Sequence, residues 1–390
     1  MRWQRVIGQE HAKEILISAI RRDRIAHAYC LWGPEGVGKD ALAIEFARVL
    51  NCSEPIVSTE RIEACGRCKD CLQMSNLQHP NVRLVFSLPA AGKGSDDDSP
   101  LVRLSDDHIA LIQEQLALKA HDPYHDISIP NATQIRIASI RDVRRTLQLS
   151  APLAHGWRVV IISEADAMTI EAANAFLKTL EEPHARTTLI LTTSRRDQLP
   201  PTILSRCQQI HCGALSDDDI AAALVERENV SPDRARVIAA LAQGSFRRAV
   251  ELVRSSQDDD SSELALTFLR TALKPSRYQN ELHGLIERRI ATLDRQQIAV
   301  VLRLLLIWLN DAYRLRTLSD ASRYLAFREG DAATALRRFI ERYTRARLDD
   351  AIEAVERAIA ALESNAQVPL ALVALAVRLR RTIGQTTSSQ

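Results

Sequence analysis

Seven residues near the start of the chain have the types and spacing of a phosphate-binding loop. They read GPEGVGK, which fits the pattern GxxxxGK. Glycines let the backbone curl tightly around a phosphate, and the lysine ammonium supplies positive charge for its outer oxygens. The loop is therefore a candidate site for ATP or ADP. Its members are Gly33, Pro34, Glu35, Gly36, Val37, Gly38 and Lys39.

The two positions that commonly bind Mg²⁺ beside such a loop both depart from the usual pattern. Asp40 stands where a Ser or Thr hydroxyl normally ligates the ion. Ser163 follows the apolar run VVII, where an Asp is expected, and Glu164 then has the position that polarises the attacking water. Asp40 either ligates Mg²⁺ directly or repels the γ-phosphate, and we favour the second interpretation. The sequence thus predicts a pocket that binds nucleotide but hydrolyses it poorly, with weakened Mg²⁺ binding.

Four cysteines shortly after this loop have the spacing of metal ligands. Cys65, Cys68 and Cys71 form a CxxCxxC run, and Cys52 precedes them. Four thiolates suffice for a closed tetrahedral Zn²⁺ site, which leaves no position for a reactive water and so fits a structural role. An iron–sulfur cluster and free buried thiols are the alternatives. We expect His79 to take part in a turn or in packing instead of binding the metal.

The whole chain sets limits on how these sites can fold. Its 390 residues suit two or three domains, since single domains cluster near roughly 100–150 residues. With 51 Lys and Arg against 49 Asp and Glu, the formal charge is only +2, so nucleic-acid binding would need a local patch. The sequence shows neither a signal peptide nor an apolar run of spanning length. This predicts a cytoplasmic protein and favours metal binding over disulfides.

The first half of the chain alternates β-rich runs with helical patterns, which is typical of a parallel sheet with helices on both faces. Apolar residues recur with helical spacing over 39–51. The phosphate loop is therefore expected between a strand and a helix, where helix N–H groups can face a phosphate. The expected strands are 28–32, 82–86, 158–162 and 188–193.

Three parts are expected along the chain. Residues 1–212 form the α/β domain, with the cysteine insertion near 52–71 and a further insertion near 88–130. Residues 213–256 form a small helical lid, and 257–390 form an all-helical domain that holds subunits together. Helices are predicted at 107–120, 216–225, 232–243, 246–255, 296–315, 348–362 and 368–381.

Several segments, in their order and spacing, resemble the clamp-loader subunits of bacteria, which are AAA+ proteins. The segments are HAYCLWGPEGVGKD around the phosphate loop, the cysteine insertion after the loop's helix, AANAFLKTLEEP at 172–183 and TILSRC at 202–207. The segment NAQVPLALVALAVRL at 365–379 resembles the closing helices of that family's collar domain. The likeness covers nearly the whole chain and implies an AAA+ module, a lid and a collar that assembles with other subunits.

The resemblance also implies roles for individual residues. Arg206 in the run SRC is similar to an arginine finger that reaches the γ-phosphate in a neighbouring subunit. A guanidinium supplied in this way stabilises a phosphoryl transition state and makes hydrolysis depend on assembly. Thr193, with Thr192 as the alternative, lies at the sensor 1 position of the family, and Arg247 lies near sensor 2.

Within this family, gamma/tau motor subunits are expected to have GKT or GKS and an acidic DE pair, and this sequence has neither. It is more similar to the delta-prime branch, a stator that itself hydrolyses little. The implied partners are the gamma/tau and delta subunits and, through the assembly, the sliding clamp and primed DNA of the DNA polymerase III holoenzyme. Arg141 and Lys178 are candidates for DNA phosphate contacts by resemblance, with simple solvation as the alternative.

Two other functions stay open from the sequence. One is an active gamma/tau-type ATPase that uses Asp40 and Glu164 in an unusual way. The other is an AAA+ ATPase of DNA repair or helicase loading. Measurable ATPase activity in the isolated chain would favour the first, and the combination of SRC with LEEP weighs against the second.

Overall fold

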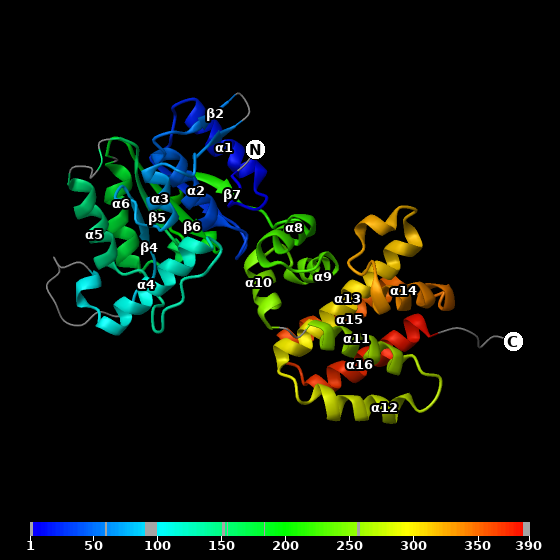
Figure 1. The fold of residues 1–390 in the computed structure, drawn as a ribbon. Helices are drawn as coiled ribbons and strands as arrows, with labels where there is room; N and C mark the ends of the chain where they lie inside the picture. Colours follow the sequence, from blue (N-terminus) through cyan, green and yellow to red (C-terminus); the bar gives the residue numbers. More distant parts are fainter. Residues whose placement is uncertain are drawn as a thin grey trace. The chain divides into compact units, whose positions relative to one another are not determined.

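The computed structural model describes residues 3–58, 61–89, 100–149, 153, 155–182, 184–255 and 258–384. Internal contacts divide the chain into two compact units (Figure 1). The first unit comprises Met1–Ser216 with Gly244–Arg247, and the second comprises Asp217–Gln243 with Arg248–Gln390. The division into three parts at residues 212 and 256 stays a prediction.

A five-stranded sheet forms the centre of the first unit and confirms the predicted α/β class. Its strands are β1 (Ala28–Trp32), β4 (Val82–Val85), β5 (Arg158–Ile162), β6 (Thr187–Thr193) and β7 (Gln208–His211). They lie in the order β4-β5-β6-β1-β7, and every neighbouring pair is parallel. The carboxyl ends of β1, β5 and β6 therefore meet at one edge of the sheet.

Helices cover both faces of this sheet because alternate strand residues are apolar on each side. The helices of this part are α1 (Glu10–Arg21), α2 (Lys39–Asn51), α3 (Lys69–Ser75), α4 (Asp106–His121), α5 (Ile137–Gln148), α6 (Ile170–Glu181) and α7 (Pro201–Leu204). On one face, Tyr29 of β1 packs edge-on against Phe46 of α2, with ring centroids 5.5 Å apart. On the other face, Cys30 belongs to a core with Ile140 of α5 and Phe176 of α6.

The elements predicted from periodicity are present with small changes at their ends. Helix α2 begins at Lys39 and strands β1 and β5 have the predicted bounds. Strand β4 ends one residue before the predicted end, and β6 begins one residue before the predicted start. Strand β7 was not predicted, because its four residues QQIH bury only Ile210 and carry little β signal.

The two insertions add short elements to the first unit. In the cysteine insertion, β2 (Ile56–Val57) pairs antiparallel with β3 (Ile62–Glu63). In the second insertion, residues 90–99 lie outside the described residues. A 3₁₀ turn (Pro100–Arg103) precedes α4, which packs against α3 of the cysteine insertion. The two insertions are thus in contact with each other.

The second half of the chain is helical, as predicted. Its helices are α8 (Asp217–Glu228), α9 (Pro232–Ala242), α10 (Phe246–Ser255), α11 (Asp258–Ala272), α12 (Tyr278–Leu285), α13 (Arg295–Thr317), α14 (Gly330–Arg342), α15 (Leu348–Glu363) and α16 (Val368–Ile383). A π-helical turn (Ile286–Ile290) follows α12. Among the described helices, none combines the length and the apolarity that a membrane span needs.

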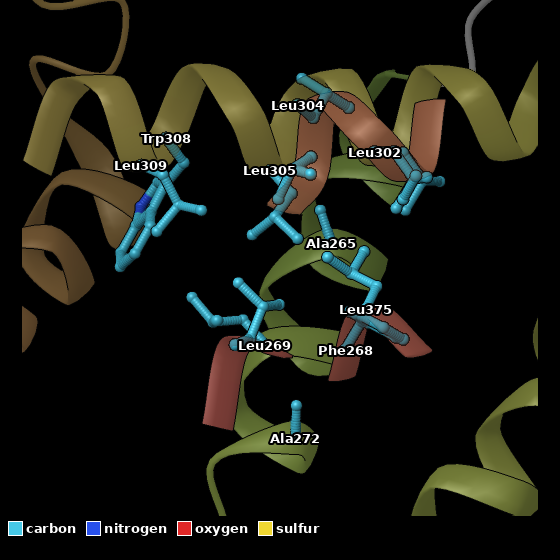
Figure 2. Close-up of a cluster of buried hydrophobic side chains, with 14 of the residues drawn as sticks. Ala265, Phe268, Leu269, Ala272, Leu302, Leu304, Leu305, Trp308, Leu309 and Leu375 are labelled. Carbon is cyan, nitrogen blue, oxygen red and sulfur yellow. The ribbon is translucent and has the colours of Figure 1, made fainter. Parts of the chain in front are cut away.

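One apolar core joins α11, α13, α15 and α16 in the second unit (Figure 2). Leu305 and Leu309 of α13 are fully buried in it. Asp294 caps the start of α13 by accepting a hydrogen bond from the Gln297 N–H, in a capping box. Near the other end of α13, the buried carboxylate of Asp311 accepts the N–H groups of residues 326 and 327, both at 2.9 Å. The long helix is thereby fixed at both ends.

Candidate nucleotide site and cysteine cluster

The phosphate loop lies at the carboxyl edge of the sheet, between β1 and α2. Gly33 has φ +153°, and a Cβ there would lie 1.9 Å from the carbonyl oxygen of Cys212. Gly38 has φ +95°, and a Cβ there would lie 2.6 Å from Tyr124 Oη. Only glycine fits both places, because each combines a left-handed backbone with a close neighbour. Backbone packing therefore requires these glycines, with or without a ligand.

The Lys39 ammonium is held by the loop itself. It donates hydrogen bonds to the carbonyl oxygens of Gly33 and Pro34, at 2.9 and 2.6 Å, and to Ser194 Oγ at 2.9 Å. Burial lowers the pKa of Lys39, and the Asp40 carboxylate opposes that shift. A phosphate could bind Lys39 only by replacing some of these three bonds.

Asp40 is partly buried, with 17% of its side chain exposed, and two hydroxyl groups and one lysine surround its carboxylate. Its Oδ2 accepts a hydrogen bond from Ser163 Oγ at 2.6 Å, and its Oδ1 accepts one from Thr192 Oγ1 at 2.7 Å. Lys119 Nζ of α4 lies 2.7 Å from Oδ2. Burial alone would raise the pKa of Asp40, but Lys119 and the two hydroxyls lower it to about 2. The two predicted metal positions, Asp40 and Ser163, therefore bind each other.

Glu164 and Thr193, both named from the sequence, occupy different surroundings. Glu164 has φ +50° and lines the cavity beside the loop. Desolvation, followed by nearby carboxylates of which Asp126 is the strongest, raises the pKa of Glu164. Thr193 is buried and donates to Asp166 Oδ1 at 2.6 Å. Thr192 is the threonine that lines the cavity.

Arg247, named from the sequence as lying near sensor 2, binds two carboxylates beside the loop. Its guanidinium lies 2.8 Å from Glu35 Oε2 and 2.8 Å from Asp126 Oδ2. The N–H of the preceding residue, Phe246, donates to the carbonyl oxygen of Gly36 at 3.0 Å. Arg247 is thus fixed against the loop by acids of this same chain.

The cavity that these side chains line has a volume of about 50 Å³. Pockets for small ligands typically enclose roughly 300–1,000 Å³. The loop is therefore closed by its own protein neighbours. A nucleotide could enter only if side chains such as Lys119, Tyr124 or Arg247 moved.

Two residues of this site, Lys119 and Tyr124, were missed from the sequence. Both belong to the second insertion, far along the chain from the phosphate loop, and neither is part of a recognisable motif. One signal was present, since a carboxylate at position 40 would be buried at the start of α2 and would need a cation. The sequence does not say which lysine supplies it, because the contact is non-local.

The four predicted metal ligands do come together. The sulfur atoms of Cys52, Cys65, Cys68 and Cys71 all lie within 4.8 Å of one another. The Cys52–Cys68 and Cys65–Cys71 sulfur pairs are each 3.9 Å apart. Ligands of a tetrahedral Zn²⁺ with Zn–S bonds of about 2.3 Å would be about 3.8 Å apart. The cluster therefore fits a zinc ion without rearrangement.

Helix ends and backbone N–H groups position these sulfurs. Cys52 directly follows the last residue of α2, and Cys68 caps the start of α3. The N–H groups of Cys65, Cys68 and Cys71 donate to the sulfurs of Cys52, Cys65 and Cys68, at 3.3, 3.3 and 3.4 Å. Such bonds favour the thiolate form that a metal requires.

His79 lies near the cluster but outside it. Its Nδ1 accepts the Asn81 N–H at 3.2 Å, and its Nε2 lies 3.4 Å from Asp70 Oδ1. Burial lowers the pKa of His79, while the Asp70 carboxylate opposes that shift. The remaining cysteines, Cys30, Cys207 and Cys212, are buried in the first unit.

Arg206 lies away from the phosphate loop, in the turn between α7 and β7. Its Nη2 lies 2.9 Å from Glu181 Oε1 of α6, and its Nη1 donates to the carbonyl oxygen of Thr202 at 3.0 Å. The next residue, Cys207, is buried in the core and anchors the turn. The Arg206 side chain is 37% exposed, so its guanidinium can reach a neighbouring molecule.

The two DNA-contact candidates are exposed on adjacent helices. Arg141 lies on α5 and Lys178 on α6, and these two helices pack against each other. Their exposure is compatible with phosphate binding and equally with solvation. Pro183, which ends the run LEEP, lies outside the described residues.

The sheet and the loop together define the class of protein. In the five-stranded parallel sheet, β1 lies between β6 and β7, and β1 leads into the phosphate loop and α2. AAA+ P-loop domains have this arrangement. A helical region follows this domain. The chain belongs to the family described as DNA polymerase III, delta subunit, whose model matches residues 8–216, just over half of the chain.

Curated relatives include two kinds of DNA polymerase III subunit. Subunit tau of Bacillus subtilis is 29% identical over 257 residues, which are 65% of this chain and 37% of that protein. Subunit delta' of Bacillus subtilis is 28% identical over 253 residues, or 65% of this chain and 61% of that protein. Subunit delta' of Pseudomonas aeruginosa is 34% identical over 191 residues, which are 49% of this chain and 44% of that protein. The chain thus spans less than two thirds of each of these relatives.

A solved structure also aligns along most of the chain. It is a DNA polymerase III gamma subunit-related protein of Thermotoga maritima, with 96% of this chain and 98% of that chain covered, 16% identity and a TM-score of 0.36. At this TM-score the likeness has no bearing on function.

Proposed function

We propose that the chain is a non-motor, delta-prime-type subunit of a bacterial clamp loader, which helps to load the sliding clamp onto primed DNA. Membership of the DNA polymerase III, delta subunit family supports this proposal, as do relatives named delta'. Its partners would be gamma/tau motor subunits and a delta subunit, with the clamp and DNA held through the assembly. A cytoplasmic location follows from this function.

The contact between Asp40 and Ser163 carries the proposal. A P-loop ATPase holds Mg²⁺ with a hydroxyl after the loop lysine and an acid at the end of a neighbouring strand. In this chain the two residue types are exchanged, and their side chains are hydrogen-bonded at 2.6 Å. Lys119 adds a positive charge 2.7 Å from Asp40. The usual metal positions are therefore satisfied inside the protein, which supports slow hydrolysis or none.

The subunit would act on a neighbour through Arg206. An arginine supplied in trans stabilises the charge that develops on a transferring phosphoryl group, and such arginines contribute roughly 10³–10⁵ to the rate in well-studied cases. Arg206 is 37% exposed and lies in a turn anchored by the buried Cys207, and among the described residues it binds the Glu181 carboxylate and the Thr202 carbonyl oxygen. These features suit a group that must leave one carboxylate to reach a neighbour's γ-phosphate.

Three finer assignments belong to the same proposal. The four cysteines would bind a structural zinc ion, because their sulfur spacing fits one. Residues 213–256 would act as the lid and 257–390 as the collar that joins subunits. Arg141 and Lys178 would face DNA phosphates within the assembly.

One alternative has an observation in its favour, because subunit tau of Bacillus subtilis is as similar to this chain as subunit delta' of the same organism. The alternative is an active gamma/tau-type ATPase that uses Asp40 and Glu164. Family membership weighs against an ATPase of DNA repair or helicase loading.

ATPase activity of the isolated full-length chain tests the proposal against this alternative. The assay uses millimolar ATP and Mg²⁺ with and without primed DNA, and a Lys39→Ala variant serves as the control. We expect the wild type and the variant to give the same background rate. Turnover by the wild type that the variant loses would instead identify a motor subunit.

A further inference from the structure

The segment from Lys119 to Asp126 lies directly on the phosphate loop. It comprises the last turn of α4 and the loop after it, and it belongs to the second insertion. Four of its residues, Lys119, Tyr124, His125 and Asp126, line the small cavity beside the loop. All of these residues belong to the first unit.

Lys119 has the surroundings of a bound cation. Only 3% of the residue is exposed, and its Nζ lies 2.7 Å from Asp40 Oδ2 and donates to the His125 carbonyl oxygen at 2.8 Å. The same Asp40 carboxylate accepts the hydroxyls of Ser163 and Thr192. Carboxylate, hydroxyl and carbonyl oxygens are the ligands that Mg²⁺ prefers. The ammonium therefore lies among oxygens that would otherwise suit a divalent ion.

Tyr124 and Asp126 fix the rest of the segment in place. Tyr124 Oη accepts the Ile7 N–H at 2.8 Å, and its ring packs edge-on against Phe246 with centroids 5.0 Å apart. The same hydroxyl lies where a side chain at Gly38 would be. Asp126 pairs with Arg247 at 2.8 Å. The segment is thus bound to three separate parts of the first unit around the loop.

We propose that residues 119–126 are a built-in plug of the phosphate loop, in which the Lys119 ammonium takes the place of the divalent cation and so excludes Mg²⁺-nucleotide. The inference rests on the proposed non-motor function and extends it, because it names the element that closes the site. Without Lys119, the Asp40 carboxylate would keep its two hydroxyl partners but would lose the ion pair at 2.7 Å. The plug makes the conformation of the loop independent of nucleotide.

Nucleotide binding to a paired variant tests the plug. Asp40→Thr with Lys119→Met removes one negative and one positive charge together and restores the residue type that usually follows the loop lysine. Binding of fluorescent mant-ADP with Mg²⁺ to the full-length chain is measured by anisotropy. We expect the paired variant to bind about tenfold more tightly than the wild type, or better.

The matched control is Asp40→Thr with Lys13→Met, which changes charge equally but keeps Lys119. Lys13 is as buried as Lys119 and lies on α1, paired with Glu10. We expect no gain in mant-ADP affinity for this control. Equal affinity of the wild type and the paired variant, or an equal gain in the control, would overturn the plug.

Hydrogen exchange of the wild type keeps the proposal testable if the paired variant does not fold. Amides of residues 33–40 and 119–126 should be protected without nucleotide, and millimolar Mg-ADP should leave their exchange unchanged. Slower exchange on adding Mg-ADP would contradict the plug. Arg206 takes no part in either experiment, so failure of the plug and failure of the proposed action in trans are distinguishable.

Discussion

The phosphate loop and the Arg206 turn of the first unit are built in opposite ways. Around the loop, Lys39, Asp40 and Arg247 all bind groups of this same chain, and the cavity between them measures about 50 Å³. Arg206 instead lies 37% exposed on an anchored turn, with a carboxylate partner that is itself half exposed. The charged groups of the phosphate loop are thus enclosed by this chain, whereas the Arg206 guanidinium is partly exposed to solvent.

Under the proposed function, this difference would let a P-loop domain keep one half of an active site shared between subunits while its own phosphate loop is closed. A site between subunits needs a phosphate loop from one chain and an arginine from the next. Closing the loop would affect only the chain's own site, because the proposed arginine, Arg206, lies on a separate turn. A subunit of this proposed type could therefore contribute an arginine to a neighbour's ATPase site without hydrolysing ATP at its own site.

Removal of the proposed zinc ion should have the largest effect, and that effect should be confined to the cysteine insertion and to α4, which packs against it. Structural zinc contributes roughly 10 kcal/mol or more in small zinc-binding peptides. We expect one zinc ion per chain, and we expect a chelator to speed hydrogen exchange over 52–75 and in α4, which packs on α3. Exchange near Arg206 should stay unchanged. A chelator already saturated with zinc is the control, and absence of metal in the purified chain would disprove the site.

Lys119→Met should give the next largest effect. It leaves the Asp40 carboxylate, whose side chain is only 17% exposed, without its cation, and breaking a buried ion pair in this way typically costs about 3–5 kcal/mol. Lys13→Met is the matched control, because Lys13 is equally buried but its partner Glu10 is 58% exposed, so no buried charge remains. We expect this control to cost about 1 kcal/mol or less. Urea unfolding of both variants checks the difference, and equal losses would show that Lys119 has no special role.

A third prediction compares Asp40 with Asp311, a buried carboxylate whose cation partner, Arg314, lies farther away, at 3.6 Å. Burial raises the pKa of Asp311 to about 6, although two backbone N–H groups and Arg314 oppose the shift. The folded state therefore binds a proton more readily than the unfolded state, so the unfolding free energy should fall as pH rises from about 4 to about 6. Asp40, with a lowered pKa of about 2, should give the opposite sign, with stability lost as pH falls from about 4 to about 2.

Asp311→Asn separates the two carboxylates. The unfolding free energy of the wild type should fall by on the order of 2 kcal/mol between about pH 4 and pH 6 because of Asp311, and the variant should lack this fall. The amide oxygen of the variant can still accept the N–H groups of residues 326 and 327. Unfolding free energies of wild type and variant across this range provide the measurement. Parallel curves for the two proteins would mean that Asp311 titrates normally.

Glu181→Gln should have the smallest effect on stability. The Arg206–Glu181 pair is exposed at 37% and 50%, and exposed pairs contribute at most about 1 kcal/mol. We expect a change in unfolding free energy below about 0.5 kcal/mol. A loss as large as that for Lys119→Met would show that the turn is as enclosed as the loop and would remove the contrast between them.

Much of the fold was predictable because its signals are local. The strand before the loop, α2, and the long helices α13 and α15 follow from apolar periodicity, and the glycines follow from the motif. The cysteine cluster was predictable for a similar reason, since three of its four members lie within seven residues. Strand β7 was missed because its residues gain β structure only from the sheet edge that β1 offers.

The closure of the phosphate loop could not be predicted from local patterns. Asp40 and Ser163 were recognised as departures from the motif, but their hydrogen bond to each other depends on how β5 and α2 meet. Lys119 reaches Asp40 from the last turn of an insertion helix, and Tyr124 reaches Gly38 from the following loop. Such contacts are set by tertiary packing, for which one sequence has no periodic signal.

ATPase activity of a reconstituted clamp loader tests the central claim most directly. The assembly contains purified motor subunits, clamp and primed DNA, with this chain as wild type, Arg206→Ala or Lys39→Ala. We predict that Arg206→Ala lowers turnover by about tenfold or more, because a neighbour loses its arginine, and that Lys39→Ala leaves turnover near the wild-type rate. The opposite pattern, in which Lys39→Ala abolishes turnover and Arg206→Ala does not, would contradict the account.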